Sequence, residues 1–166
     1  MSEGIHRIPI PTPFAVGRVN VYLIEDEPLT LVDTGPNSAT SFDELTTGLA
    51  GLGHALGDVE LVIVTHQHID HLGLVALVAQ RSGAEVAAID VLAPYLEDFS
   101  QEAQKDDEFA RSVMLRNGIP EDVVSALSAV SQAFRAWGSR ADVTRVLRDG
   151  EEMERHRDEV LALIRS

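Results

Sequence analysis

The sequence predicts one α/β domain built on a mixed sheet, and three observations support that prediction. The length of 166 residues is typical of a single domain with a sizeable core. Two short apolar segments at 19–24 and 29–32, separated by an acidic turn that contains a proline, predict an antiparallel hairpin. Residues 59–89 then follow a strand–loop–helix–strand order, which predicts two parallel strands joined by a crossover.

Proline, serine and glycine positions define the elements on either side of the hairpin. Alternate prolines between residues 5 and 14 exclude a central strand and favour an extended edge segment. A helix is expected over residues 41–52, with Ser41 as its N-cap, Glu44 at the capping-box position and Gly53 at its end.

The crossover unit has three expected parts. Residues 59–64 are almost continuously apolar, which is typical of a strand that is buried on both faces. Residues 72–80 are apolar nearly all round and predict a buried helix. Gly83 ends that helix, and residues 84–89 return to a strand.

The remaining chain is expected to belong to the same domain as the core half, residues 1–93. Residues 94–138 are expected to form a helical segment, and residues 139–166 a strand at 143–147 followed by a terminal helix. Five large side chains of the helical segment are expected in the core: Phe99, Phe109, Met114, Phe134 and Trp137. One apolar helix stripe is expected at Val123, Leu127, Val130, Phe134 and Trp137.

Composition excludes several classes of protein. The formal net charge of −14 repels phosphate backbones and anionic membranes, so neither nucleic acid nor a membrane is an expected partner. The chain has no cysteine, which excludes disulfides, thiolate metal sites and cysteine nucleophiles. The first residues show no secretory-signal pattern and no apolar run is long enough to span a bilayer, so we expect a cytoplasmic protein.

The chemistry-bearing residues are concentrated directly after the first buried strand of the crossover. His66, His68, Asp70 and His71 lie within six consecutive positions. In an extended segment His66 and His68 point to the same side, where two imidazoles can bind one metal ion. Nitrogen and oxygen ligands without sulfur suit zinc, iron or manganese. One such histidine alone is often an ordinary core residue, but burying four polar side chains without a partner would be costly.

This segment resembles the H-x-H-x-D-H signature of the metallo-β-lactamase-like hydrolase family. The resemblance extends through the first half of the chain, because residues 20–24 and 31–35 look like that family's opening hairpin and its Asp-Thr-Gly turn. It implies an αββα sandwich, here incomplete, with the first ββα half plus a terminal helix.

The same resemblance implies the site. His66 and His68 would bind a first zinc ion, and Asp70 and His71 a second, with Asp70 also orienting the attacking hydroxide. Asp33 would contact a metal-binding side chain without binding the metal itself. The alternative is that Asp33 is an ordinary turn residue, because Asp-Thr-Gly is also a sequence that favours turns. Family members hydrolyse thioesters, lactams, lactones, phosphodiesters and other esters.

The pattern breaks after His71. A catalytic zinc commonly has three protein ligands and a water, and the family's later ligands have no counterpart here. His156 is the one histidine that follows, in a charged run typical of an exposed helix face, and His6 and His54 are expected at the surface. We therefore expect the second half of the family fold to be missing between about Met153 and His156. A half sandwich would expose an apolar face, so a homo-oligomer or a covering partner is expected.

The predicted function is zinc-dependent hydrolysis of a small ester, thioester or lactone-type substrate through a metal-bound hydroxide. Two alternatives stay open, namely an iron-dependent dioxygenase on the same fold and a catalytically inactive metal-binding or oligomerisation module. The helical segment at 94–138 follows the metal loop and could form a lid over the site.

Overall fold

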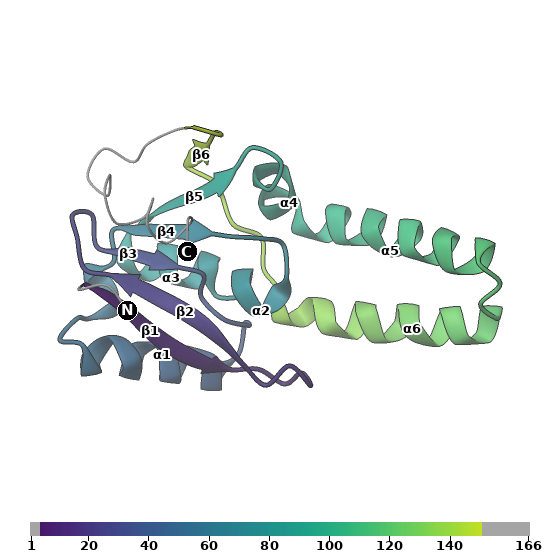
Figure 1. Ribbon diagram of the computed structural model, residues 1–166, viewed down its shortest axis with the longest axis horizontal. Helices are drawn as coiled ribbons and strands as arrows, with labels where there is room; N and C mark the ends of the chain where they lie inside the picture. Colours follow the sequence, from purple (N-terminus) through teal and green to yellow (C-terminus); the bar gives the residue numbers. More distant parts are fainter. Residues whose placement is uncertain (1–3, 151–166) are drawn as a thin grey trace.

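A computed structural model describes residues 4–150 and shows a six-stranded mixed sheet flanked by helices (Figure 1). The strands are β1 (Ile5–Pro11), β2 (Arg18–Ile24), β3 (Thr30–Val32), β4 (Leu61–Val64), β5 (Glu85–Ile89) and β6 (Arg145–Leu147). Their order in the sheet is their order in the sequence. The β1–β2 and β2–β3 pairs are antiparallel, and every later pair is parallel. The predicted α/β class, hairpin and crossover are therefore confirmed.

The helices lie in the connections between the parallel strands. They are α1 (Ala39–Gly51), η1 (Leu56–Asp58), α2 (Ile69–Leu72), α3 (Val75–Ser82), α4 (Ala93–Glu97), α5 (Phe99–Arg116), α6 (Glu121–Phe134) and η2 (Arg135–Trp137). Side chains of α1 and α3 share one buried cluster with alternate side chains of the strands, such as Leu45, Val78 and Val62. That cluster fixes the position of the loops at the strand ends.

The prolines lie at the edge of the sheet, as expected. β1 pairs only with β2 among the described strands, and Pro9 faces Asn20 there. Proline lacks an N–H group to donate, so an edge strand tolerates it and a central strand does not.

The N-cap of α1 is Ser38 and not Ser41, so the expected cap was wrong. The Ser38 side chain accepts a hydrogen bond from the backbone N–H of Ser41 at 3.0 Å. Ser41 is fully buried, and its hydroxyl donates to the carbonyl of Pro11 at 3.1 Å. A buried serine that holds the edge strand cannot be distinguished by spacing from one that caps a helix.

The buried helix expected over residues 72–80 is confirmed as α3, but it begins at Val75, because Leu72 ends α2 and Gly73 and Leu74 separate the two helices. A Cβ at Gly73 would lie 2.3 Å from both the backbone nitrogen of Asn37 and the carbonyl oxygen of Trp137. The close approach of two other backbone segments therefore requires glycine at this joint. Gly83 has φ +80 and ends α3, as the sequence predicted.

Helices α5 and α6 form an antiparallel arm that extends away from the sheet (Figure 1). Phe109 and Phe134, which were expected in the core, are exposed on this arm, together with other members of the apolar stripe of α6. The exposed fractions are 43% for Val123, 49% for Leu127, 49% for Val130, 42% for Phe134 and 68% for Phe109. The expected core positions of Phe109 and Phe134 were wrong, because an arm of two helices buries only one side of each. In α6 the side with fully buried Val124 and with Ser131, which donates to Asp107 of α5, is the one that is covered. Phe99, at the base of the arm, is buried as expected.

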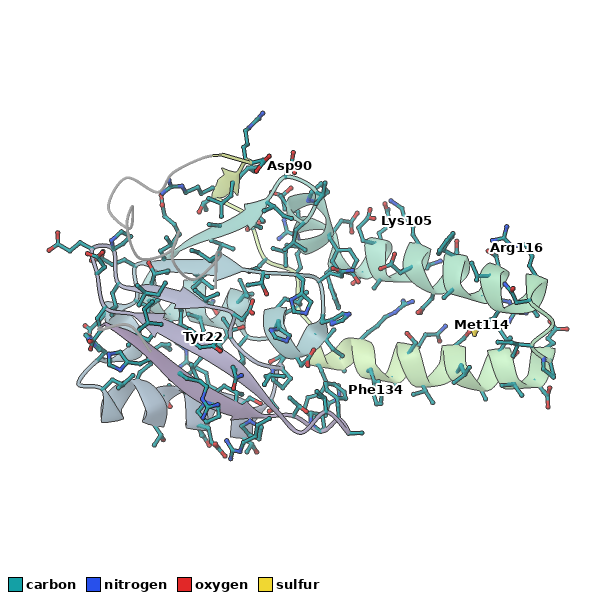
Figure 2. The ribbon with its side chains drawn as sticks, in the orientation of Figure 1. Tyr22, Asp90, Lys105, Met114, Arg116 and Phe134 are labelled. Atoms are coloured by element: carbon teal, nitrogen blue, oxygen red, sulfur yellow. The ribbon has the colours of Figure 1, made fainter. Side chains whose placement is uncertain are left out.

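The base of the arm is anchored beside the crossover, and its tip is free of the sheet. Figure 2 shows Met114 and Arg116 toward the tip of the arm, whereas Lys105 lies nearer its base and Phe134 at its sheet end. There the backbone N–H of Asn37 donates to the carbonyl of Trp137 at 2.8 Å. A lid role for the arm stays a prediction.

The short strand expected at 143–147 is confirmed as β6, which pairs with β5 in parallel. The expected terminal helix from residue 151, the proposed junction near Met153, and His156 all lie outside the described residues. Within residues 4–150, no helix combines the length and apolarity that crossing a bilayer requires.

Candidate metal centre

The site is built where two neighbouring parallel strands end. Asp33 directly follows β3, and the segment from Thr65 directly follows β4. Because Val32 pairs with Ile63 in the parallel ladder, both loops emerge from the same edge of the sheet. The carboxyl ends of parallel strands are the usual ligand sites of such sheets.

Asp33 is a buried acceptor at the centre of the site. Its backbone is left-handed, with φ +62, a conformation that aspartate adopts more readily than most residues. Its Oδ1 accepts the backbone N–H of Thr65 at 2.9 Å, and its Oδ2 accepts the Thr65 hydroxyl at 2.7 Å. His71 Nδ1 lies 2.8 Å from the same Oδ2. The residue is 4% exposed, so these partners replace water.

The imidazole rings of His66, His68 and His71 lie close together, and the His71 ring contacts Asp33. The ring centroid of His66 lies 4.2 Å from that of His71 and 4.7 Å from that of His68. Asp33, His66 and His71 each offer a ligand atom, and these three atoms lie within 4.8 Å of one another. Within residues 4–150 this is the group of three side chains with metal-binding geometry. The nitrogen and oxygen donors fit a divalent transition metal.

His68 and Asp70 lie beside this group without joining it. His68 is exposed at the N-cap of α2, and its ring lies edge-on to that of His66. Asp70 is the first acidic residue of α2, and its Oδ2 lies 3.9 Å from His71 Nε2. Of the five predicted site residues, the structure therefore brings together the ligand atoms of Asp33, His66 and His71, whereas His68 and Asp70 are neighbours of that group.

Electrostatics separate two of the histidines. Burial lowers the pKa of His66, and the neighbouring rings of His71 and His68 lower it further. The hydrogen bond to Asp33 raises the pKa of His71. At neutral pH His66 is therefore uncharged and keeps a nitrogen lone pair, which a metal ligand requires.

Two threonines that the sequence pattern did not single out fix the site residues through hydrogen bonds. Thr34 is fully buried, and both its backbone N–H and its hydroxyl donate to the carbonyl of His71, at 2.9 and 3.0 Å. Thr65 contacts Asp33 as described above. Each threonine directly adjoins a predicted site residue in sequence, and that adjacency is the signal that could have identified them.

The other two described histidines lie at the opposite end of the sheet, away from the candidate centre. His6 and His54 both contact Glu25, which follows β2. The end of β2 pairs with the start of β3, so Glu25 lies at the amino ends of the parallel strands.

Comparison with known proteins gives a consistent result. A model of the metallo-beta-lactamase superfamily matches residues 15–163. The "probable metallo-hydrolase YqjP" of Bacillus subtilis is 32% identical over 149 residues, which are 90% of this chain and 46% of that protein. A metal-dependent hydrolase of Pyrococcus furiosus is 53% identical over 38 residues, 23% of this chain and 17% of that protein.

Solved structures agree on the fold. A metallo-beta-lactamase family protein of Thermus thermophilus superposes with a TM-score of 0.62 at 28% identity, covering 89% of this chain and 47% of that one. The subclass B3 enzyme BJP-1 of Bradyrhizobium japonicum superposes with a TM-score of 0.57 at 22% identity, covering 89% and 44%. The chain thus spans about half the length of the relatives it matches.

Proposed function

The chain belongs to the metallo-beta-lactamase superfamily, and from that membership we propose that it carries the metal-binding half of a zinc-dependent hydrolase for small ester, thioester or lactone-type substrates. The coarser assignment, a probable metal-dependent hydrolase, rests on the family and its relatives. The finer one rests mainly on a single observation, the convergence of His66 and His71 on the buried carboxylate of Asp33.

The proposed ligands follow the sequence pattern and fit the packing. His66 and His68 would hold one ion, and Asp70 and His71 a second. The adjacent rings of His66 and His68 support the first assignment, and the approach of Asp70 to His71 Nε2 supports the second. Asp33 would orient the His71 ring through a hydrogen bond and would not bind the metal itself, because both of its oxygens already accept hydrogen bonds from the protein.

The chain's own residues would prepare the site for hydrolysis. A bound divalent cation lowers the pKa of water to about 7 and polarises a carbonyl oxygen. Asp70 would orient the attacking water by accepting one of its protons in a hydrogen bond. Asp33 keeps the His71 ring in a fixed orientation, and Thr34 fixes the His71 backbone. A preorganised site needs little rearrangement when the reaction proceeds.

The charge of the chain supports a small acyl substrate. With a formal net charge of −14, long-range electrostatics oppose the approach of a polyanion such as nucleic acid. A compact ester or thioester carries little or no such charge density. A small-molecule substrate, without nucleic acid or a membrane, therefore stays our proposal.

The test combines metal binding with turnover in the full chain, loaded with zinc. We expect hydrolysis of at least one compound from a panel of small thioesters and lactones, and loss of that activity in His68→Ala. His54→Ala is the matched control, because His54 lies at the far end of the sheet. Equal activity of wild type and His68→Ala would contradict the proposal.

A second candidate is a metal-binding module without catalytic activity. Its supporting observation is that residues 72–150 contain no histidine to complete a three-ligand zinc site. Zinc binding without turnover of any panel compound would favour it. The iron-dependent dioxygenase differs in its metal, so metal analysis of the purified protein distinguishes that alternative.

A further inference from the structure

The hydroxyl of Thr65 lies between a carboxylate and an imidazole of the candidate centre. Its Oγ1 is 2.7 Å from Asp33 Oδ2 and 2.8 Å from His66 Nδ1. The Thr65 backbone N–H also donates to Asp33 Oδ1 at 2.9 Å, which fixes the residue at two points. Threonine is branched at Cβ, so its χ1 angle has few alternatives once the backbone is held.

The proton count assigns a direction to each hydrogen bond. A carboxylate only accepts, and a hydroxyl has one hydrogen to donate. The Thr65 hydroxyl therefore donates to Asp33, and the bond between Thr65 and His66 must use the proton on His66 Nδ1. A neutral His66 then carries its proton on Nδ1 and keeps the lone pair of Nε2 free.

His71 has the same Nδ1–H tautomer, but it contacts Asp33 directly and not through a hydroxyl. Its Nδ1 lies 2.8 Å from Asp33 Oδ2, so the proton of its neutral ring is also on Nδ1. One buried carboxylate thus faces His71 directly and His66 through a hydroxyl. The donor nitrogens left for a ligand are Nε2 on both rings.

We propose that Thr65 is a positioning residue: its hydroxyl links Asp33 to His66 by two hydrogen bonds, orients the His66 ring and selects the Nδ1–H tautomer of that ring. The metal-binding consequence rests on the proposed function, but the tautomer itself does not. A plain turn residue after β4 would need neither the hydroxyl nor this orientation.

The direct test is the tautomer of His66 in the metal-free full chain. Long-range ¹H–¹⁵N correlation spectra would be recorded above the pKa of the ring, with the His66 signals assigned through a His66→Gln variant. We expect the Nδ1–H form in the wild type and in Thr65→Ser, and a shift toward the Nε2–H form in Thr65→Val. His71, held by Asp33 directly, should keep its Nδ1–H form in all three proteins.

Metal affinity provides a second readout. Titration with Zn²⁺ should give a Kd that is roughly 10–100-fold weaker in Thr65→Val, the usual cost of losing a partner of a metal ligand, and little changed in Thr65→Ser. Should Thr65→Val not fold, Thr65→Ala replaces it. An Nε2–H tautomer in the wild type, or an Nδ1–H tautomer that survives loss of the hydroxyl, would overturn the proposal. Absence of hydrolase activity would contradict the proposed function but not the proposed role of Thr65.

Discussion

A carboxylate lies beside histidine rings at each of two opposite ends of the same sheet. The two clusters differ in which ring nitrogen contacts the carboxylate. At the carboxyl ends of the parallel strands, Asp33 contacts Nδ1 of His71. At the amino ends, Glu25 contacts Nε2 of His54 at 2.9 Å and Nε2 of His6 at 2.8 Å.

Burial is the second difference. The Asp33 side chain is 6% exposed and that of Glu25 is 35% exposed. A buried carboxylate with fixed donors orients its partners permanently, whereas an exposed one exchanges them with water. Similar residue types therefore make a candidate ligand site at one end and a surface ion-pair cluster at the other. Four predictions test this contrast, from the largest expected effect to the smallest.

Metal binding should separate the two clusters most strongly. We expect His71→Ala to weaken Zn²⁺ binding by more than about 100-fold, because losing a ligand should exceed the loss of an outer partner. His54→Ala should leave the Kd unchanged, since its Nε2 already faces Glu25. Isothermal titration calorimetry measures both, and an equal loss in the two variants would show that the clusters do not differ.

The glycines beside the two clusters should differ in their tolerance of a methyl group. Gly73→Ala places Cβ against two backbone atoms at 2.3 Å, so we expect a loss near the upper end of about 1–3 kcal/mol in the free energy of unfolding. Gly57, in the segment that follows His54, has no atom within 4 Å of such a Cβ. Urea unfolding of Gly57→Ala should match the wild type, and a tolerated Gly73→Ala would refute the close packing behind the metal loop.

Neutralising each carboxylate should cost more stability at the buried end than at the exposed end. Asp33→Asn keeps the shape and tolerates the left-handed backbone, but an amide cannot accept all three hydrogen bonds at once. We expect a loss of about 1 kcal/mol. Glu25→Gln is the matched exposed variant and should lose clearly less stability at neutral pH than Asp33→Asn. Thermal or urea unfolding decides, and a larger effect in Glu25→Gln would reverse the comparison.

Acid should reveal the smaller contribution of the exposed cluster. Hydrogen bonds from His54 and then His6 lower the pKa of Glu25 from its ordinary value of 4.5. A lowered carboxyl pKa stabilises the fold above 4.5, and that contribution is lost as the pH falls through the folded-state value. Any difference in unfolding midpoint between wild type and Glu25→Gln should therefore shrink in acid. A difference that grows as the pH falls would contradict the direction of the shift.

Local sequence patterns were sufficient where one segment decides its own structure. The hairpin, the edge position of β1, the parallel crossover and the stop at Gly83 all followed from residue type and spacing. Such patterns failed where a partner from elsewhere in the chain decides. The expected cap at Ser41 was wrong because its contact with Pro11 is invisible in sequence, and the break at Gly73 depends on Asn37 and Trp137.

The expected core position of Phe134 on α6 failed for the same reason. The period of the apolar stripe specifies an amphipathic helix, but the period does not say which neighbour the helix meets. In the described part of the chain, α6 packs on α5 through another side, and the stripe from Val123 to Phe134 stays exposed.

The sequence by itself determined which side chains are available as ligands of the candidate centre, because four ligand-type residues fall within one short loop after a buried strand. Tertiary structure alone decided which nitrogen of each ring is free, since that depends on Asp33 and Thr65 being placed behind the rings by two paired strands. Residue types set the available chemistry, whereas hydrogen-bond direction is a property of groups that meet only in the folded chain.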